Sequence, residues 1–240
     1  MNCFDVFNGD ADGLCALQQL RLEDPRDSVL VTGVKRDIGL LARVEAQAGD
    51  EIWALDIALE KNRADLDRLL ASGARVRYFD HHFPGEIPTH PLLDTHIDTT
   101  PDRGTSLLVD DFLGGSQRAW AVVGTFGDNF DESARRAAQP LGLTGSQLDA
   151  LRDLGIYLNY NGYGAEVADL HLPPDALFLC FLPYANPLDF MWAGLNRLTG
   201  ERLGDHGRGG RFSRDRRDRL ATGIFDVTRN AGDGAACAHA

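Results

Sequence analysis

Short apolar runs alternate with helical patterns over roughly the first hundred residues, and this alternation limits the fold more than any other feature of the chain. Runs rich in β-forming residues predict strands at 3–7, 28–33, 51–56, 75–79 and 92–97. Stretches with helical periodicity lie between the first four of these runs, at 14–22, 38–48 and 61–71. Because parallel strands are joined by crossover helices, this order predicts an α/β fold, with a parallel β-sheet of about five strands flanked by helices.

The pattern after the fifth run is mostly helical. Helices are predicted at 104–113, 117–129, 132–138 and 144–157, and a less regular segment is expected from there to about 198. We therefore expect an α/β core over residues 1–135, a helical extension over 136–200, and an irregular or mobile tail over 201–240. A hydrophobic content of 43% is enough to bury a sizeable core.

The formal net charge of −12 restricts the partners of the protein. An acidic surface repels polyanions, so long nucleic acid is not expected as a partner, whereas a short oligonucleotide at a metal site is compatible with this charge. No apolar run is long enough to span a bilayer, and the N-terminus has no basic region followed by an apolar stretch. We therefore expect a cytoplasmic protein without a membrane partner. The four cysteines show no CxxC spacing, which argues against a zinc site or a disulfide framework.

Acidic and imidazole side chains gather where the predicted strands end. They are Asn8, Asp10 and Asp12 after the first strand, Asp56 at the end of the third, and Asp80, His81 and His82 after the fourth. Asp128 follows a further apolar run at 120–126. Because the carboxyl ends of parallel strands meet at one edge of the sheet, we expect these side chains to lie close together.

These residue types suit a hard divalent cation. Asp10 and Asp12 are separated by one alanine, and two carboxylates this close repel each other unless a cation lies between them. Oxygen-rich sites with an imidazole suit manganese or magnesium better than zinc. A carboxylate shared between two cations about 3.5–4 Å apart is typical of hydrolases that activate water to attack phosphorus.

Each segment also has an ordinary structural interpretation. An Asp-Ala-Asp-Gly run is often a solvated turn or a helix cap, and Asp56 could cap the helix that follows it. The metal site is favoured because four separate segments place suitable groups at the same predicted edge.

The motifs resemble those of the DHH superfamily of phosphoesterases over about residues 3–200. The four matching segments are Phe7-Asn8-Gly9-Asp10-Ala11-Asp12-Gly13, Asp56, Asp80-His81-His82 and Gly127-Asp128-Asn129. The resemblance implies two Mn²⁺ ions, with Mg²⁺ or Co²⁺ as substitutes. The metal-ligand positions that it implies are Asn8, Asp10, Asp12, Asp56, His81 and Asp128.

The resemblance also implies a role for individual positions. Asp56 would bridge both ions, Asp10 would bind the first, and the second would be bound by Asp12, His81 and Asp128. The catalytic set would be Asp56, His82 and Asp80, in which His82 faces the substrate phosphate and Asp80 orients a histidine.

The chain departs from the family pattern in two places. Asn8 stands where many members have a metal-binding histidine or aspartate, and a neutral amide oxygen predicts weaker binding of the first ion. Residues 201–240 contain nothing like a complete DHHA1 domain, the C-terminal domain that sets substrate specificity in most members, so a truncated or altered C-terminus is one interpretation.

Arg103, Thr105 and Ser106 are further candidates for contact with phosphate, together with His82. A guanidinium and two hydroxyls at a helix start can bind an anion. The alternative is that Thr105 and Ser106 are ordinary cap or first-turn residues.

The run at 159–164 contains two tyrosines in a polar, turn-rich context. It could stack on a base or a ribose. We favour the alternative of a turn that ends a helix, with its tyrosines packed inward.

The predicted function is manganese-dependent hydrolysis of a small phosphoester or phosphoanhydride, such as a short oligonucleotide, a nucleotide or a polyphosphate, by two-metal activation of water. The alternative is a catalytically weak binding or regulatory module with the same fold, which Asn8 and the missing C-terminal domain favour. Metal content separates the two, because an enzyme of this class should hold two ions. The sequence leaves the oligomeric state open.

Overall fold

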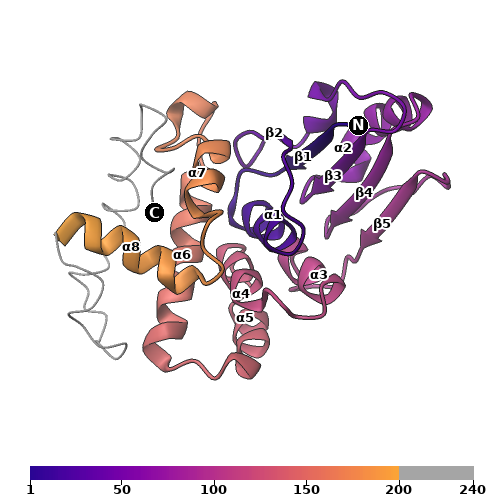
Figure 1. The fold of residues 1–240 in the computed structure, drawn as a ribbon. Helices are drawn as coiled ribbons and strands as arrows, with labels where there is room; N and C mark the ends of the chain where they lie inside the picture. Colours follow the sequence, from indigo (N-terminus) through magenta and orange to yellow (C-terminus); the bar gives the residue numbers. More distant parts are fainter. Residues whose placement is uncertain (200–240) are drawn as a thin grey trace.

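The computed structural model describes residues 1–199, and the side chains of residues 1–193. Its strands are β1 (Cys3–Phe7), β2 (Val29–Val31), β3 (Glu51–Leu55), β4 (Arg75–Asp80) and β5 (Leu93–Ile97). They form one sheet in the order β2-β1-β3-β4-β5, and every neighbouring pair is parallel (Figure 1). The prediction of a five-stranded parallel sheet flanked by helices is confirmed.

The α-helices lie on both faces of the sheet and continue beyond it. They are α1 (Ala11–Glu23), α2 (Leu59–Ala71), α3 (Thr105–Phe112), α4 (Arg118–Gly127), α5 (Asp131–Ala138), α6 (Gly145–Asn161), α7 (Pro174–Phe181) and α8 (Pro187–Thr199). Figure 1 shows α1 between the sheet and helices α6 and α7. No helix within residues 1–199 has both the length and the apolarity needed to cross a membrane.

The strands alternate between two cores because successive side chains point to opposite faces of a sheet. Phe7, Leu55 and Phe79 belong to the core that contains α1 and α4. Their neighbours Val6 and Ala54 belong to the core that contains α2. The sheet is therefore covered on both sides, which leaves its carboxyl edge as the place where polar side chains can gather.

The helix predicted at 38–48 is wrong in extent, because only Leu40–Arg43 forms a short 3-10 turn. Side chains of α2 bind the backbone of this segment instead. Arg68 donates to the carbonyl oxygens of Leu41 and Val44 at 3.1 Å, and Asn62 accepts from the Leu41 amide at 3.1 Å. These bonds satisfy the backbone without a longer helix.

The segment after 164 is more regular than predicted, because it contains α7 and α8. Phe178 and Phe181 of α7 are buried in the same core as α1. The predicted tail at 201–240 lies outside the described residues.

A buried ion pair joins β1 to α1. The Arg21 guanidinium donates to both carboxylate oxygens of Asp5, at 2.6 and 2.7 Å, and both side chains are buried. Asp5 also accepts from the Ser28 hydroxyl at 2.6 Å. A buried carboxylate that loses its partner is strongly destabilising.

We predict that Arg21→Met lowers the free energy of unfolding by about 3–5 kcal/mol, because Asp5 stays buried without its cation. Urea denaturation measures the change. Arg26→Met is the matched control, since Arg26 pairs at the partly exposed surface with Asp24 and Glu51, where such pairs are worth about 0–1 kcal/mol. Equal losses in the two variants would contradict the prediction.

Helices α1, α4 and α6 approach one another closely at Gly127, the residue before Asp128. A Cβ atom at Gly127 would lie 2.2 Å from Cβ of Ala11 and 2.9 Å from the carbonyl oxygen of Gly155. The absence of a side chain here lets the end of α4 reach the start of α1, which brings Asp128 towards the carboxyl edge of the sheet.

Gly127→Ala should therefore cost about 1–3 kcal/mol of stability through overpacking. Thermal unfolding followed by circular dichroism measures it. Gly145→Ala provides the control: it is the same substitution at the first residue of α6, where an added Cβ meets nothing within 4 Å. A Gly127→Ala protein as stable as this control would show that the helices can separate without cost.

Candidate metal centre

Asp10 and Asp12 are fixed by backbone amides at the start of two helices. Asp10 Oδ1 accepts from the amides of Asp12 and Gly13, both at 3.1 Å, which explains why α1 begins at Ala11. The two oxygens of Asp12 accept from the amides of Thr105 and Ser106 at 2.6 and 2.9 Å. The N-terminus of α3 thus binds and orients a carboxylate that lies on α1.

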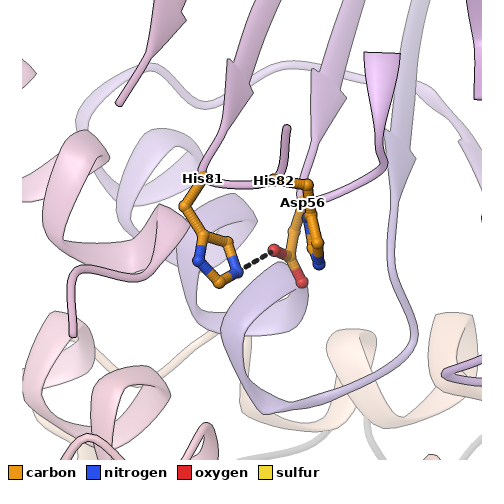
Figure 2. A group of neighbouring side chains, drawn as sticks. All are labelled: Asp56, His81 and His82. Atoms are coloured by element: carbon orange, nitrogen blue, oxygen red, sulfur yellow. Dashed lines mark ion pairs between the residues drawn. The ribbon is translucent and has the colours of Figure 1, made fainter. Parts of the chain in front are cut away.

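Asp56 follows β3 in a left-handed backbone conformation, with φ of 59°. Its amide donates to the carbonyl oxygen of Phe79 at 3.0 Å, and its carboxylate accepts from the Thr105 hydroxyl at 2.9 Å. Aspartate tolerates this conformation better than most residues. The turn directs the buried Asp56 carboxylate towards His81, as Figure 2 shows.

His81 lies at the centre of three carboxylates. Its Nε2 atom is 3.4 Å from Asp56 Oδ1, 3.5 Å from Asp128 Oδ2 and 3.9 Å from Asp12 Oδ2. The atom is buried and has no hydrogen-bond partner. These four side chains come from α1, the end of β3, the end of β4 and the end of α4, and their donor atoms suit a hard cation.

His82 extends the centre towards solvent. Its Nδ1 atom lies 2.7 Å from Asp80 Oδ1, which also accepts from the His81 amide at 2.9 Å. The hydrogen bond to Asp80 raises the pKa of His82 against the opposing effect of burial. Asp80 therefore holds the His82 ring, which is 42% exposed and can reach a ligand. The roles predicted for both residues stay predictions.

Negative charge is concentrated at this edge of the sheet. Burial raises the pKa of the Asp56 carboxyl well above its usual value, and the neighbouring carboxylates raise it further. Burial, followed by the charges of Asp12 and Asp10, raises the pKa of Asp128 to about 6. A cation bound among these groups would relieve the repulsion between them.

Lys35 is a member of the site that the sequence interpretation missed. Its Nζ atom lies 2.6 Å from Asp10 Oδ2, 3.0 Å from Asp128 Oδ1 and 2.8 Å from Asn159 Oδ1. Lys35 follows β2, so the rule that located the aspartates, that ligands gather at the carboxyl ends of parallel strands, could have found it. Asn159 is near the end of α6 and gave no comparable signal.

Asn8 lies beside this lysine and is buried. Its Nδ2 atom donates to the Lys35 carbonyl oxygen at 3.3 Å, whereas its Oδ1 atom is buried without a partner. Metal binding by Asn8 stays a prediction.

Two predicted phosphate-binding residues face the carboxylates instead of an open surface. Thr105 and Ser106 are fully buried, and their hydroxyls donate to Asp56 Oδ1 and to the Asp12 carbonyl oxygen, each at 2.9 Å. These contacts favour a positioning role. Arg103 pairs with Asp98 at 3.3 Å and with Asp111.

The run at 159–164 ends α6 as predicted, but the prediction that its tyrosines pack inward is wrong. Tyr160 and Tyr163 are each 60% exposed. Lys35 Nζ lies 5.9 Å from the centre of the Tyr163 ring, which places an exposed aromatic surface beside the carboxylates.

The structure is similar to crystal structures of exonuclease RecJ. One, bound to manganese, is 17% identical over 95% of this chain and 74% of that chain, with a TM-score of 0.49. Another, in complex with Mn²⁺ from Thermus thermophilus, is 18% identical, with a TM-score of 0.41, over 95% of this chain and 42% of that one. This chain therefore spans less than half of the Thermus protein's length.

An uncharacterized protein from Helicobacter pylori is also similar, at 14% identity and a TM-score of 0.41, over 96% of this chain and 71% of that one. No protein-family model matches the chain. A comparison with curated protein sequences also finds no match. The function is therefore inferred from the site itself.

We predict that Asp56→Asn stabilises the metal-free protein by about 0.5–2 kcal/mol and weakens divalent-ion binding. The amide keeps the shape and the tolerance for a positive φ, and it removes a carboxyl group whose ionisation is made costly by burial and by the neighbouring carboxylates. Thermal unfolding in a chelator, and again with excess Mn²⁺, measures both effects. Asp67→Asn, at an exposed position on α2, is the control. A lower melting temperature for Asp56→Asn in chelator would show that repulsion does not dominate there.

Proposed function

We propose that the protein is a divalent-metal-dependent phosphoesterase or phosphodiesterase that hydrolyses a small phosphoester or phosphoanhydride. The observation that carries this proposal is the buried Nε2 atom of His81, which makes no hydrogen bond and faces three carboxylates from separate segments. This arrangement is costly unless a cation binds there.

The donor set favours Mn²⁺, with Mg²⁺ or Co²⁺ as substitutes, because it combines carboxylate oxygens with a single central imidazole. When bound, such an ion activates water and neutralises charge on the phosphoryl oxygens.

The protein's own groups support this chemistry from fixed positions. Asp12 is oriented by two amides, and Asp56 by the Thr105 hydroxyl. His82, oriented by Asp80, has a raised pKa and an exposed ring, so it can donate a hydrogen bond to phosphate or to the leaving group.

The net charge of −12 supports a small substrate over a long polyanion. A short oligonucleotide, a nucleotide or a polyphosphate fits this requirement. The exposed Tyr163 ring beside Lys35 favours the substrates that carry a base, since a base can stack on it.

A binding or regulatory module is the second candidate. The observation that favours it is Lys35, whose ammonium partly neutralises Asp10 and Asp128 without any metal ion. Such a module would bind a phosphorylated ligand without turnover.

The test is product release from a panel of substrates by the Mn²⁺-loaded protein. The panel contains bis-p-nitrophenyl phosphate, pyrophosphate, polyphosphate, a linear dinucleotide and a cyclic dinucleotide. We expect turnover of at least one member, with a fall of about 1000-fold or more in Asp56→Asn, because several kcal/mol of charge stabilisation would be lost. Asp67→Asn should retain activity. No turnover of any member by the unsubstituted protein would favour the binding module.

A further inference from the structure

We infer that Lys35 occupies one of two cation positions in this site, so that the protein binds a single divalent ion and the lysine ammonium supplies the second positive charge. This inference rests on the proposed function, and it replaces the expected pair of ions with one ion and one ammonium group.

Lys35 is held by contacts of both its side chain and its backbone. Its Nζ atom contacts three oxygens at 2.6–3.0 Å, from Asp10, Asp128 and Asn159. Its backbone is fixed as well, because its amide donates to the Gly162 carbonyl oxygen at 2.9 Å. The side chain is only 28% exposed. Lys35 is thus coordinated by oxygens from three segments, as a bound cation would be.

Both carboxylate oxygens of Asp10, the ligand expected for the first ion, already have partners. Its Oδ1 atom accepts from two amides at the start of α1, and its Oδ2 atom pairs with Lys35. Neighbouring Asn8 is neutral and uses its amide group on the Lys35 carbonyl oxygen. Within the described part of the chain, two groups of three side chains bring possible metal-ligand atoms close together, and neither includes Asp10. They are Asp56, His81 and His82, and Asp12, His81 and Asp128.

Asp128 is shared between His81 and Lys35. Its Oδ2 atom lies 3.5 Å from His81 Nε2, and its Oδ1 atom lies 3.0 Å from Lys35 Nζ. One carboxylate therefore faces the candidate ion position with one oxygen and the ammonium with the other. A bridging carboxylate does the same between two metal ions. A second divalent ion next to the ammonium would meet repulsion from it.

The consequence is a fixed positive charge on the Asp10 side of the site that does not depend on metal concentration. From there, the ammonium charge can attract a phosphoryl group that lies near the ion.

The experiment is a count of Mn²⁺ ions per chain, by equilibrium dialysis with metal analysis and by electron paramagnetic resonance. We expect one tightly bound ion in the unsubstituted protein, with the spectrum of an isolated Mn²⁺. In Lys35→Ala the count should rise to two, with spin coupling between the ions. Lys35→Met, which keeps the aliphatic stem, serves if the alanine variant does not fold.

Three control variants separate the effect of the Lys35 charge from other effects on the ion count. Lys61→Ala, at an exposed lysine on α2, and Lys35→Arg, which keeps the charge, should both retain one ion. His81→Ala should lose it, which separates the site from weak surface binding. Two ions in the unsubstituted protein, or one ion still in both Lys35→Ala and Lys35→Met, would overturn the inference and leave the proposed function standing. One ion without turnover of any substrate would instead refute the proposed function.

Discussion

The mutual repulsion of four carboxylates, three buried and the fourth, Asp128, partly buried, is the constraint on which the rest of the site depends. Asp10, Asp12, Asp56 and Asp128 meet at the carboxyl edge of the sheet, where burial leaves little water to screen them. The surrounding structure offsets this cost at each position. Amides at the starts of α1 and α3 bind two of the carboxylates, the Thr105 hydroxyl binds a third, and the Lys35 ammonium binds the fourth.

Rigid elements hold these groups in place. The candidate ligands lie at the ends of strands or at the termini of α1 and α4, where backbone hydrogen bonds fix the chain. Asp56 adds a left-handed turn, a conformation that residues other than glycine rarely adopt and that is enriched at functional sites. The lack of a Cβ atom at Gly127 then lets α4 come close enough for Asp128 to join the group.

The sequence predicted the strands and the gathering of acids because both follow from local patterns and from one rule of parallel sheets. Asp12 and His81 meet as that rule requires. The extent of the segment at 38–48 could not be predicted, since it depends on hydrogen bonds from Arg68 and Asn62 of α2. The contacts of Thr105 could not be predicted either. The local sequence marks the start of a helix at Thr105, but only the folded chain shows that its amide and hydroxyl bind Asp12 and Asp56.

The helical segment after the sheet contributes contacts to the site. The end of α6 and the loop after β2 meet through the bond from the Lys35 amide to Gly162 and through the contact of Lys35 with Asn159. The segment after the α/β core therefore positions the Lys35 ammonium group, in addition to covering a face of α1. Tyr163 is the residue after Gly162, and its ring faces the Lys35 ammonium group. Because the turn at the end of α6 binds the Lys35 amide and also carries the exposed Tyr163 ring, the positions of the ammonium group and of the ring are set together.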